Sequence, residues 1–237
     1  MSGHSHAKTI KHQKELTDQK RGQAFSKMAR VISVAVKEGG PNPETNYKLR
    51  IAIETAKEVN MPKDNVERAV KRGTGELAGE KLEEITFEAY GPGGAAVIIE
   101  GITDNKNRAL GEIKQAINQY NGKMVGEGGV RWMFDKKGVI TINSESKEES
   151  ELSAIESGAQ DIRWRDSILE VYTKPEELEQ VRKKMDEKNA KIDSCSLEWV
   201  PKEEIDIDDK AKADCQKLFD ALDELESVQG IYSNLKI

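Results

Sequence analysis

Residues 208–235, DDKAKADCQKLFDALDELESVQGIYSNL, determine the topology that we expect for this chain of 237 residues. They predict a helix over 208–226 and a strand over 228–235, and neither element has a partner in its own part of the sequence. Earlier in the chain, residues 82–131 predict a β-β-α-β unit, which is an incomplete sheet when it stands alone. The C-terminal helix and strand supply what this unit lacks. We therefore expect the chain to return and complete one discontinuous α+β domain.

Alternation and turn residues predict the elements of that unit. The alternating stretch Ile85-Thr-Phe87-Glu-Ala89 is typical of a half-buried strand, and the apolar stretch after it is typical of a buried one. The glycine-rich segments Gly91-Pro-Gly-Gly94 and Gly126-Glu-Gly-Gly129 lack the strand-to-helix context of a phosphate-binding loop, so we interpret both as structural. The expected elements are a strand over 85–89, a turn over 91–94, a strand over 95–102, a helix capped by Asp104 and ending near Tyr120, and a strand from Lys123.

Residues 132–202 predict a complete second α+β unit. The order is β-α-β-β-α-β, the split arrangement of ferredoxin-like folds. The expected elements are a strand over 132–142 containing a turn-like Lys136-Lys137-Gly138, a helix over 147–157, strands over 160–164 and 168–173, a helix from Pro175 to about Asn189, and a strand over 191–200. The predicted fold class is α+β with three domains: an N-terminal helical bundle and two ferredoxin-like α+β domains, the middle one discontinuous.

Residues 1–75 predict the helical bundle. Apolar residues recur every three or four positions from Phe25 to Val36, as on one face of a helix. This first helix begins after Thr17 and ends at Gly39-Gly40. A second is expected from Pro43 or Glu44 to about Asn60, and a short third from Pro62 to Gly73. The expected domains are 1–75, then 82–131 with 206–237, then 132–202.

Basic and acidic residues are distributed unequally along the chain. Residues 1–75 carry 15 Lys and Arg against 8 Asp and Glu, whereas the remainder carries 22 against 35. The arm over residues 3–30 holds all three histidines and seven of the basic residues. A basic region on a chain of net charge −6 favours a polyanionic partner.

Nucleic acid is the partner that this pattern favours, because cations that approach phosphates release condensed counterions. The alternative is an ordinary solvated helix face. No helix-turn-helix, RRM or KH signature is visible, so nothing indicates a sequence code. The expected nucleic-acid-binding residues are His4, His6, Lys8, Lys11, His12, Lys14, Lys20, Arg21, Lys27, Arg30, Lys63, Arg68, Lys71 and Arg72.

The sequence offers little support for a metal site, a catalytic nucleophile, a disulfide or a membrane span. His4, His6 and His12 lack a nearby Cys, Asp or Glu to complete a metal site, and a histidine-dependent nucleophile would have to reach back to this arm. Cys195 and Cys215 are 20 positions apart without a CxxC motif, which favours reduced thiols in the cytoplasm. The longest apolar run is Ala95–Ile99, far too short to cross a bilayer. We expect no enzyme activity, no metal, no cofactor and no membrane association.

Several motifs occur along the whole chain: GHSHAKTIKH (3–12), DQKRGQAFSK (18–27), NMPKDNVERAVKRGTG (60–75), EAYGPGGAAVI (88–98), TDNKNR (103–108), FDKKGVI (134–140), VYT (171–173) and VQGIYSN (228–234). Together they resemble the YebC family, which includes the mitochondrial translational activator of cytochrome c oxidase. The departures from the family pattern are His6-Ala7, where it has Lys-Trp, and Val125–Val130, where it has LGE-S-GSV.

The resemblance implies three domains around a central cavity and a cytoplasmic, non-enzymatic role. Members are labelled probable transcriptional regulators that bind DNA. Others are described as translation factors that act at the ribosome and ease the synthesis of proline-rich stretches. The resemblance thus leaves DNA and ribosomal RNA both open as the partner.

Overall fold

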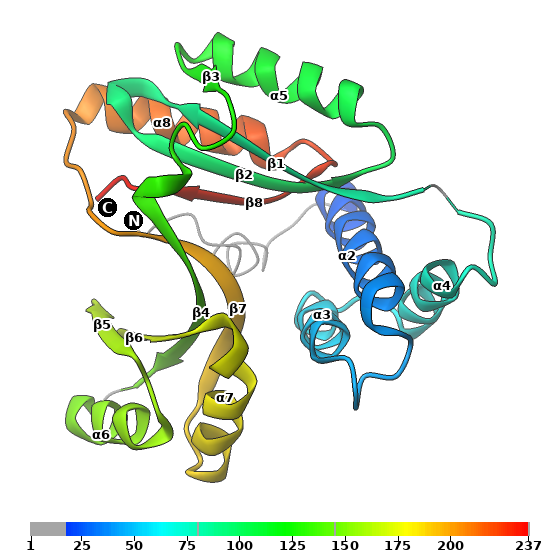
Figure 1. Cartoon of the computed structure of the whole chain (residues 1–237), viewed down its shortest axis with the longest axis vertical. Coiled ribbons are helices and arrows are strands. Elements are labelled where there is room, and N and C mark those ends of the chain that lie inside the picture. Colours follow the sequence, from blue (N-terminus) through cyan, green and yellow to red (C-terminus); the bar gives the residue numbers. More distant parts are fainter. Residues whose placement is uncertain (1–17, 80, 145, 237) are drawn as a thin grey trace. The chain divides into compact units, whose positions relative to one another are not determined.

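The computed structural model describes residues 18–79, 81–144 and 146–236. The described chain divides into two compact units. One is Phe134–Lys202, and the other combines the residues before Phe134 with those after Lys202. The α+β class predicted from the sequence is confirmed: a region of three helices precedes two four-stranded antiparallel sheets that carry helices (Figure 1).

Three helices open the described chain, and the long first helix packs against both others. Their shared core is apolar and includes Met28, Ile32 and Leu49, of which Ile32 and Leu49 are fully buried. This burial follows the three- and four-residue spacing of the sequence, and burial of one apolar stripe is the main stabilising force for such helices. The helices are α2 (Asp18–Gly39), α3 (Tyr47–Glu58) and α4 (Lys63–Thr74).

The join between α2 and α3 differs from the prediction. The second helix begins at Tyr47 rather than at Pro43 or Glu44, because Asn46 caps it: its Oδ1 accepts the Leu49 amide at 3.1 Å. The same side chain donates through Nδ2 to the carbonyls of Ala35 and Gly40, at 2.7 and 2.8 Å. One buried amide therefore satisfies helix ends on both sides of the turn. Thr17, the predicted cap of the first helix, lies outside the described residues.

The end of α4 also differs from the prediction by one half-turn. Gly73 does not stop the helix; Gly75 does, with φ of 82° in the left-handed region that glycine tolerates best. Gly73 has a packing role instead. A Cβ at this position would lie 2.6 Å from the Ser33 carbonyl oxygen and from Val36 Cβ, so only glycine allows α4 to approach α2 this closely.

The second part of this unit is a four-stranded sheet with strand order β3-β1-β2-β8. Strand β8 pairs antiparallel with β2, with Val97 opposite Ser233, so the chain end lies in the middle sheet as residues 208–235 predict. Helices α5 and α8 cover one face (Figure 1), and their apolar stripes share a core with the strands. The elements are β1 (Glu83–Tyr90), a 3₁₀ turn η2 (Pro92–Gly94), β2 (Ala96–Thr103), α5 (Lys106–Gln119), β3 (Lys123–Val125), the 3₁₀ turn η3 (Arg131–Met133), α8 (Asp209–Asp223) and β8 (Val228–Ser233).

Two predictions for this sheet are wrong. Its element order is β-β-α-β-α-β, so its connectivity is not the β-α-β-β-α-β of a ferredoxin-like domain. The N-cap of α5 is Asn105, whose side chain accepts the Arg108 amide at 3.1 Å, rather than Asp104. Asp104 instead forms an ion pair with Arg108.

The unit Phe134–Lys202 has the β-α-β-β-α-β order expected from its sequence, and its strands lie in the order β5-β6-β4-β7. Residues 136–138 form no turn, contrary to the prediction, because β4 runs straight through them. Gly138 is needed there for packing: a Cβ would lie 2.3 Å from Thr173 Oγ1 and 2.8 Å from Leu178. The elements are β4 (Phe134–Asn143), α6 (Lys147–Ser157), β5 (Asp161–Arg165), β6 (Ile168–Thr173), the 3₁₀ turn η4 (Pro175–Glu177), α7 (Leu178–Glu187) and β7 (Ile192–Pro201).

Candidate nucleic-acid interface

The predicted binding residues fall into two groups. Those of the N-terminal arm lie outside the described residues: His4, His6, Lys8, Lys11, His12 and Lys14. The other eight lie on α2 and α4. The structure assigns these eight to different surroundings, so they are not equivalent candidates.

Lys27 on α2 is engaged within the chain. Its ammonium group forms an ion pair with the Asp223 carboxylate at 3.1 Å and also donates to the Asp223 carbonyl. Only 14% of its side chain is exposed. A cation so engaged has less of its charge available to an external phosphate than a solvated one.

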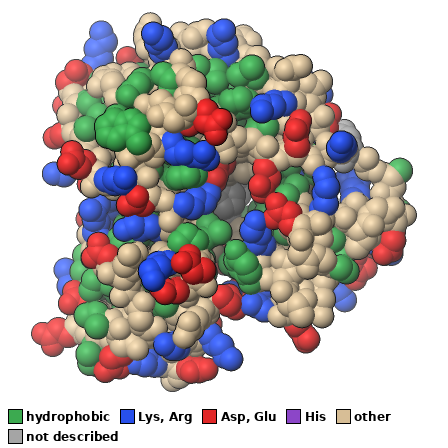
Figure 2. Space-filling view, viewed as in Figure 1, with side chains coloured by type: hydrophobic (Ala, Val, Ile, Leu, Met, Phe, Trp, Pro, Cys, Tyr) green, Lys and Arg blue, Asp and Glu red, His purple; other side chains and the backbone are tan. Residues whose placement is uncertain are grey.

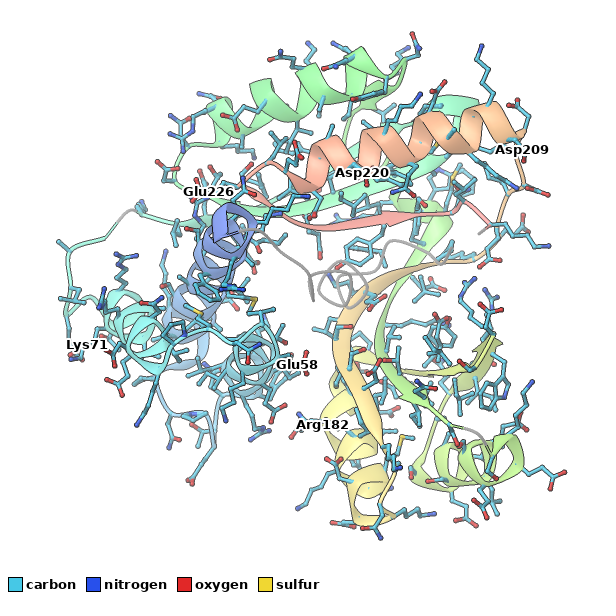
Figure 3. The ribbon with its side chains drawn as sticks, turned by 180° about the vertical axis from the view of Figure 1, so that it is seen from behind. Glu58, Lys71, Arg182, Asp209, Asp220 and Glu226 are labelled. Carbon is cyan, nitrogen blue, oxygen red and sulfur yellow. The ribbon has the colours of Figure 1, made fainter. Side chains whose placement is uncertain are left out.

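Arg30, one turn further along α2, is engaged in the same way. Its Nη2 lies 3.0 Å from Glu226 Oε1, and its Nη1 donates to the Ile102 carbonyl at 3.3 Å. Figure 3 shows Glu226 in the connection between α8 and β8, beside α2. Lys27 and Arg30 thus hold α2 against the middle sheet, a role that a linear sequence does not reveal.

Helix α4 presents the cations that remain available. Arg68, Lys71 and Arg72 are exposed, and none of them forms an ion pair with another residue of the described chain. Figure 3 shows Lys71 on the side of α4 away from α2. Lys63 forms an ion pair of 3.8 Å with Glu67, but its side chain is 89% exposed and therefore largely solvated. At the start of α2, Lys20 and Arg21 are exposed.

A groove of about 1280 Å³ lies along the inner faces of α2 and α4. Its α2 wall is a stripe at helical spacing that includes Gly22, Phe25, Arg30 and Lys37. The segment between α4 and β1 closes another side, and the N-terminal part of α5 and the connection from α8 to β8 close the rest. All of these walls belong to one compact unit.

Positive charge predominates in this groove. The cationic side chains among its lining residues are Arg30, Lys37, Arg68, Arg72, Lys81 and Arg108, against the acidic Glu112, Glu224 and Glu226. Elsewhere the signs are mixed: on the face that Figure 2 shows, Lys and Arg are interspersed with Asp and Glu. The groove is therefore a local concentration of cations on an acidic chain.

Sequence reasoning missed three of these cations. Lys37 lies seven positions after Arg30, so the helical period of α2 could have placed it on the same face. Lys81 and Arg108 reach the groove only through the tertiary fold, and no pattern in the sequence signals them.

A buried carboxylate organises a loop elsewhere in the same unit. Glu88 on β1 is 4% exposed and accepts the amides of Gly128, Val130 and Arg131, at 2.8, 2.8 and 2.9 Å. Burial raises the pKa of this carboxyl, but the three amide hydrogen bonds and the charge of Arg131 outweigh it and leave the pKa below its usual value. The glycine-rich loop is thereby held in place by one side chain.

The residues that the structure describes offer neither a metal site nor a membrane span. No cluster of three or more His, Cys, Asp or Glu residues there could hold a metal ion. No helix of the described chain is long and apolar enough to span a bilayer.

Comparison with known proteins identifies the family to which the chain belongs. The model described as "TACO1/YebC protein N-terminal domain" matches residues 5–76, and that described as "TACO1/YebC second and third domain" matches residues 82–235. The chain belongs to the TACO1/YebC family. A "Probable transcriptional regulatory protein" of Desulfosudis oleivorans is 46% identical over 239 residues, covering 100% of this chain and 97% of the relative. One of the same name from Nitratiruptor sp. is 44% identical and covers 100% of both chains.

A solved structure has the same fold. The crystal structure of the conserved hypothetical protein Aq1575 from Aquifex aeolicus has a TM-score of 0.87 and 40% sequence identity, and the match covers 95% of each chain. The relatives are named as probable transcriptional regulatory proteins.

Proposed function

We propose that this TACO1/YebC protein regulates gene expression by binding nucleic acid through cations of its helical region. The observation that carries the proposal is the set of exposed cations on α4, Arg68, Lys71 and Arg72, without ion-pair partners in the described chain. A cation that has no internal partner can neutralise a phosphate without first giving up an existing interaction. The names of the relatives support a regulatory role.

The binding is electrostatic and only weakly selective for sequence. Lys and Arg contacts to phosphate fix position but carry no base information. The net charge of −6 for the whole chain confines the polyanion to the basic helical region, since the remainder repels it. In this proposal the arm residues His4 to Lys14 add further phosphate contacts, and Lys27 and Arg30 contribute mainly by holding α2 in place.

The partner is DNA if the role is transcriptional, as the relatives' names suggest, and ribosomal RNA if the protein is a translation factor that relieves stalling on proline-rich stretches. Either role places the protein in the cytoplasm. We also propose that residues 1–75 and the discontinuous region 82–131 with 206–237 act as separate domains beside 132–202.

In-cell crosslinking followed by sequencing of the bound nucleic acid tests this proposal. We expect the wild-type chain to recover nucleic acid, and a variant with Arg68, Lys71 and Arg72 changed to alanine to recover much less. Reads spread over promoters would indicate the transcriptional role, whereas reads concentrated in ribosomal RNA would indicate the translational one. Equal recovery by both proteins would contradict the proposal.

A further inference from the structure

We propose that the groove along α2 and α4 is a binding site for single-stranded nucleic acid. This inference rests on the proposed function and specifies it, because it names the form of the ligand and the part of the surface that takes it. The exposed cations of α4 on their own could bind any polyanion. A groove with walls restricts the ligand to polyanions that fit between those walls.

The position of the cations in the groove is the first argument. Arg68 and Arg72 are four residues apart on α4, so both project from one face of this helix into the groove. Lys81 comes from the segment between α4 and β1, and Arg108, whose charge is shared with Asp104, comes from α5. Cations on several walls can follow a phosphate backbone along a groove, which is the arrangement of proteins that bind single strands.

Apolar side chains supply the second argument. Phe25, Met61, Leu82 and Leu225 also line the groove. Phe25 is only partly buried against the helical core. A single strand exposes the faces of its bases as well as its phosphates, and an aromatic side chain such as Phe25 offers a stacking surface for a base.

A buried hydroxyl group supplies the third argument. Ser227 lines the groove and is 5% exposed, yet its Oγ has no hydrogen-bond partner in the described part of the chain. Buried polar groups without a partner are rare in folded proteins, and each calls for an explanation. A rotation of this side chain toward the groove would let a phosphate or sugar oxygen of a bound strand supply the missing partner.

The dimensions of the groove favour a single strand over a duplex. The volume of about 1280 Å³ slightly exceeds the 300–1,000 Å³ that is usual for small-molecule sites. A duplex carries its phosphates on the outside of a wide rod and would contact only the rim. A single strand can enter and contact cations, Phe25 and Ser227 together.

A steric block that removes no charge gives the sharpest test. Gly22 lies on the α2 wall, and a Cβ added there meets nothing within 4 Å. Gly22→Phe therefore projects a ring into the groove without disturbing the helix, where any residue other than proline is more favourable than glycine. Gly111→Phe is the matched control, since Gly111 lies on α5, is equally open and does not line the groove.

Binding of the full-length proteins to fluorescent oligonucleotides of about ten nucleotides, within the usual site size for single strands, is measured by anisotropy. The probes are single-stranded RNA, single-stranded DNA and duplex DNA. We expect Gly22→Phe to weaken single-strand binding by about tenfold and to leave duplex binding within about twofold. Gly111→Phe should leave both unchanged. Circular dichroism of each variant verifies the fold.

A second pair of variants tests the same groove through charge. Arg72 and Lys71 are neighbours on α4, but only Arg72 lines the groove. Arg72→Ala should therefore weaken single-strand binding several times more than Lys71→Ala. The comparison of the RNA and DNA probes shows whether the groove prefers one sugar.

The outcomes separate the two proposals. If the wild-type protein binds none of the probes, the proposed function fails and the groove inference fails with it. If the wild type binds but Gly22→Phe binds single strands equally well, or Lys71→Ala costs as much as Arg72→Ala, the proposed function stands and the groove inference is wrong.

Discussion

Arg30 on α2 and Glu226 in the connection from α8 to β8 form an ion pair of 3.0 Å, although they are 196 positions apart in the sequence. With Lys27 and Asp223, this pair fastens the basic helix to the most C-terminal elements of the chain. Two cations that the sequence predicts to bind phosphate are thus engaged in ion pairs within the folded chain. The neighbouring groove depends on this attachment, because Glu226 and Arg30 both line it.

The first prediction concerns this attachment. Arg30→Ala removes the ion pair and the hydrogen bond to Ile102, and Arg30 is 13% exposed while Glu226 is 54% exposed. Because solvent screens the outer partner, we expect the free energy of unfolding to fall by about 1–2 kcal/mol. Urea denaturation measures it. The exposed Arg68 is the control, and Arg68→Ala should change stability by less than about 0.5 kcal/mol. Equal effects would show that Arg30 has no special structural role.

The second prediction concerns Glu88. Glu88→Gln keeps the shape of the side chain but removes the negative charge of the carboxylate that accepts hydrogen bonds from three backbone amides. We therefore expect the free energy of unfolding to fall by about 2 kcal/mol. Amide hydrogen exchange should accelerate most at Gly128, Val130 and Arg131. Glu127, 90% exposed, lies in the same loop, and Glu127→Gln serves as the control. Unchanged exchange of the loop amides in Glu88→Gln would contradict this account.

The third prediction follows from the lowered pKa of Glu88. A carboxyl whose pKa is lower in the folded than in the unfolded state stabilises the fold fully above the unfolded value, about 4.3 for glutamate. This contribution is lost as the pH falls through the folded pKa. The stability difference between wild type and Glu88→Gln should therefore be constant near neutral pH and shrink in acid. A difference that stays constant down to acid unfolding would rule out the charge as its source.

The fourth prediction concerns Asn46. Its side chain caps α3 and donates hydrogen bonds to two carbonyls near the end of α2. Asn46→Ala leaves these helix-end groups without their partner and should lower the free energy of unfolding by about 2–3 kcal/mol. Thermal or urea unfolding measures this loss. Asn42 is a suitable control, because it is exposed and its side chain accepts one hydrogen bond, from the Glu44 amide, among the described residues. Similar losses for both variants would argue against the double cap.

The fifth prediction concerns the thiols. Burial, and then the nearby Asp214, raise the pKa of Cys215 to about 11. Only the thiolate reacts with iodoacetamide, so Cys215 should be unmodified in the folded protein at neutral pH. Mass spectrometry should find modification of Cys195, which is partly exposed, before that of Cys215. Rapid labelling of Cys215 without unfolding would contradict its buried position.

Local patterns explain most of what the sequence predicts correctly. Helix α6 has its predicted bounds, Lys147–Ser157, because Gly158 takes a left-handed conformation directly after it. The return of β8 to the middle sheet follows from an incomplete sheet and an unpartnered strand. These features depend on periodicity and on the count of elements, which a sequence displays directly.

The wrong predictions depend on contacts that a sequence does not display. The sequence pattern predicts a helix end at Gly73 and a turn at Gly138, yet each is a point where two elements approach too closely for a Cβ. The same is true of the site. The sequence pattern predicts that Lys27 and Arg30 bind phosphate, but the fold pairs them with Asp223 and Glu226. Arg108 likewise joins the groove only through the fold.

The salt dependence of binding tests the central claim most directly. The equilibrium constant for a single-stranded oligonucleotide is measured against salt concentration for the wild type and for the variant with Arg68, Lys71 and Arg72 changed to alanine. If these cations contact phosphates, the variant binds more weakly and its log–log slope is smaller in magnitude by about 0.7 for each phosphate contact that is lost. An unchanged slope would contradict the claim that the α4 cations form the phosphate-binding surface.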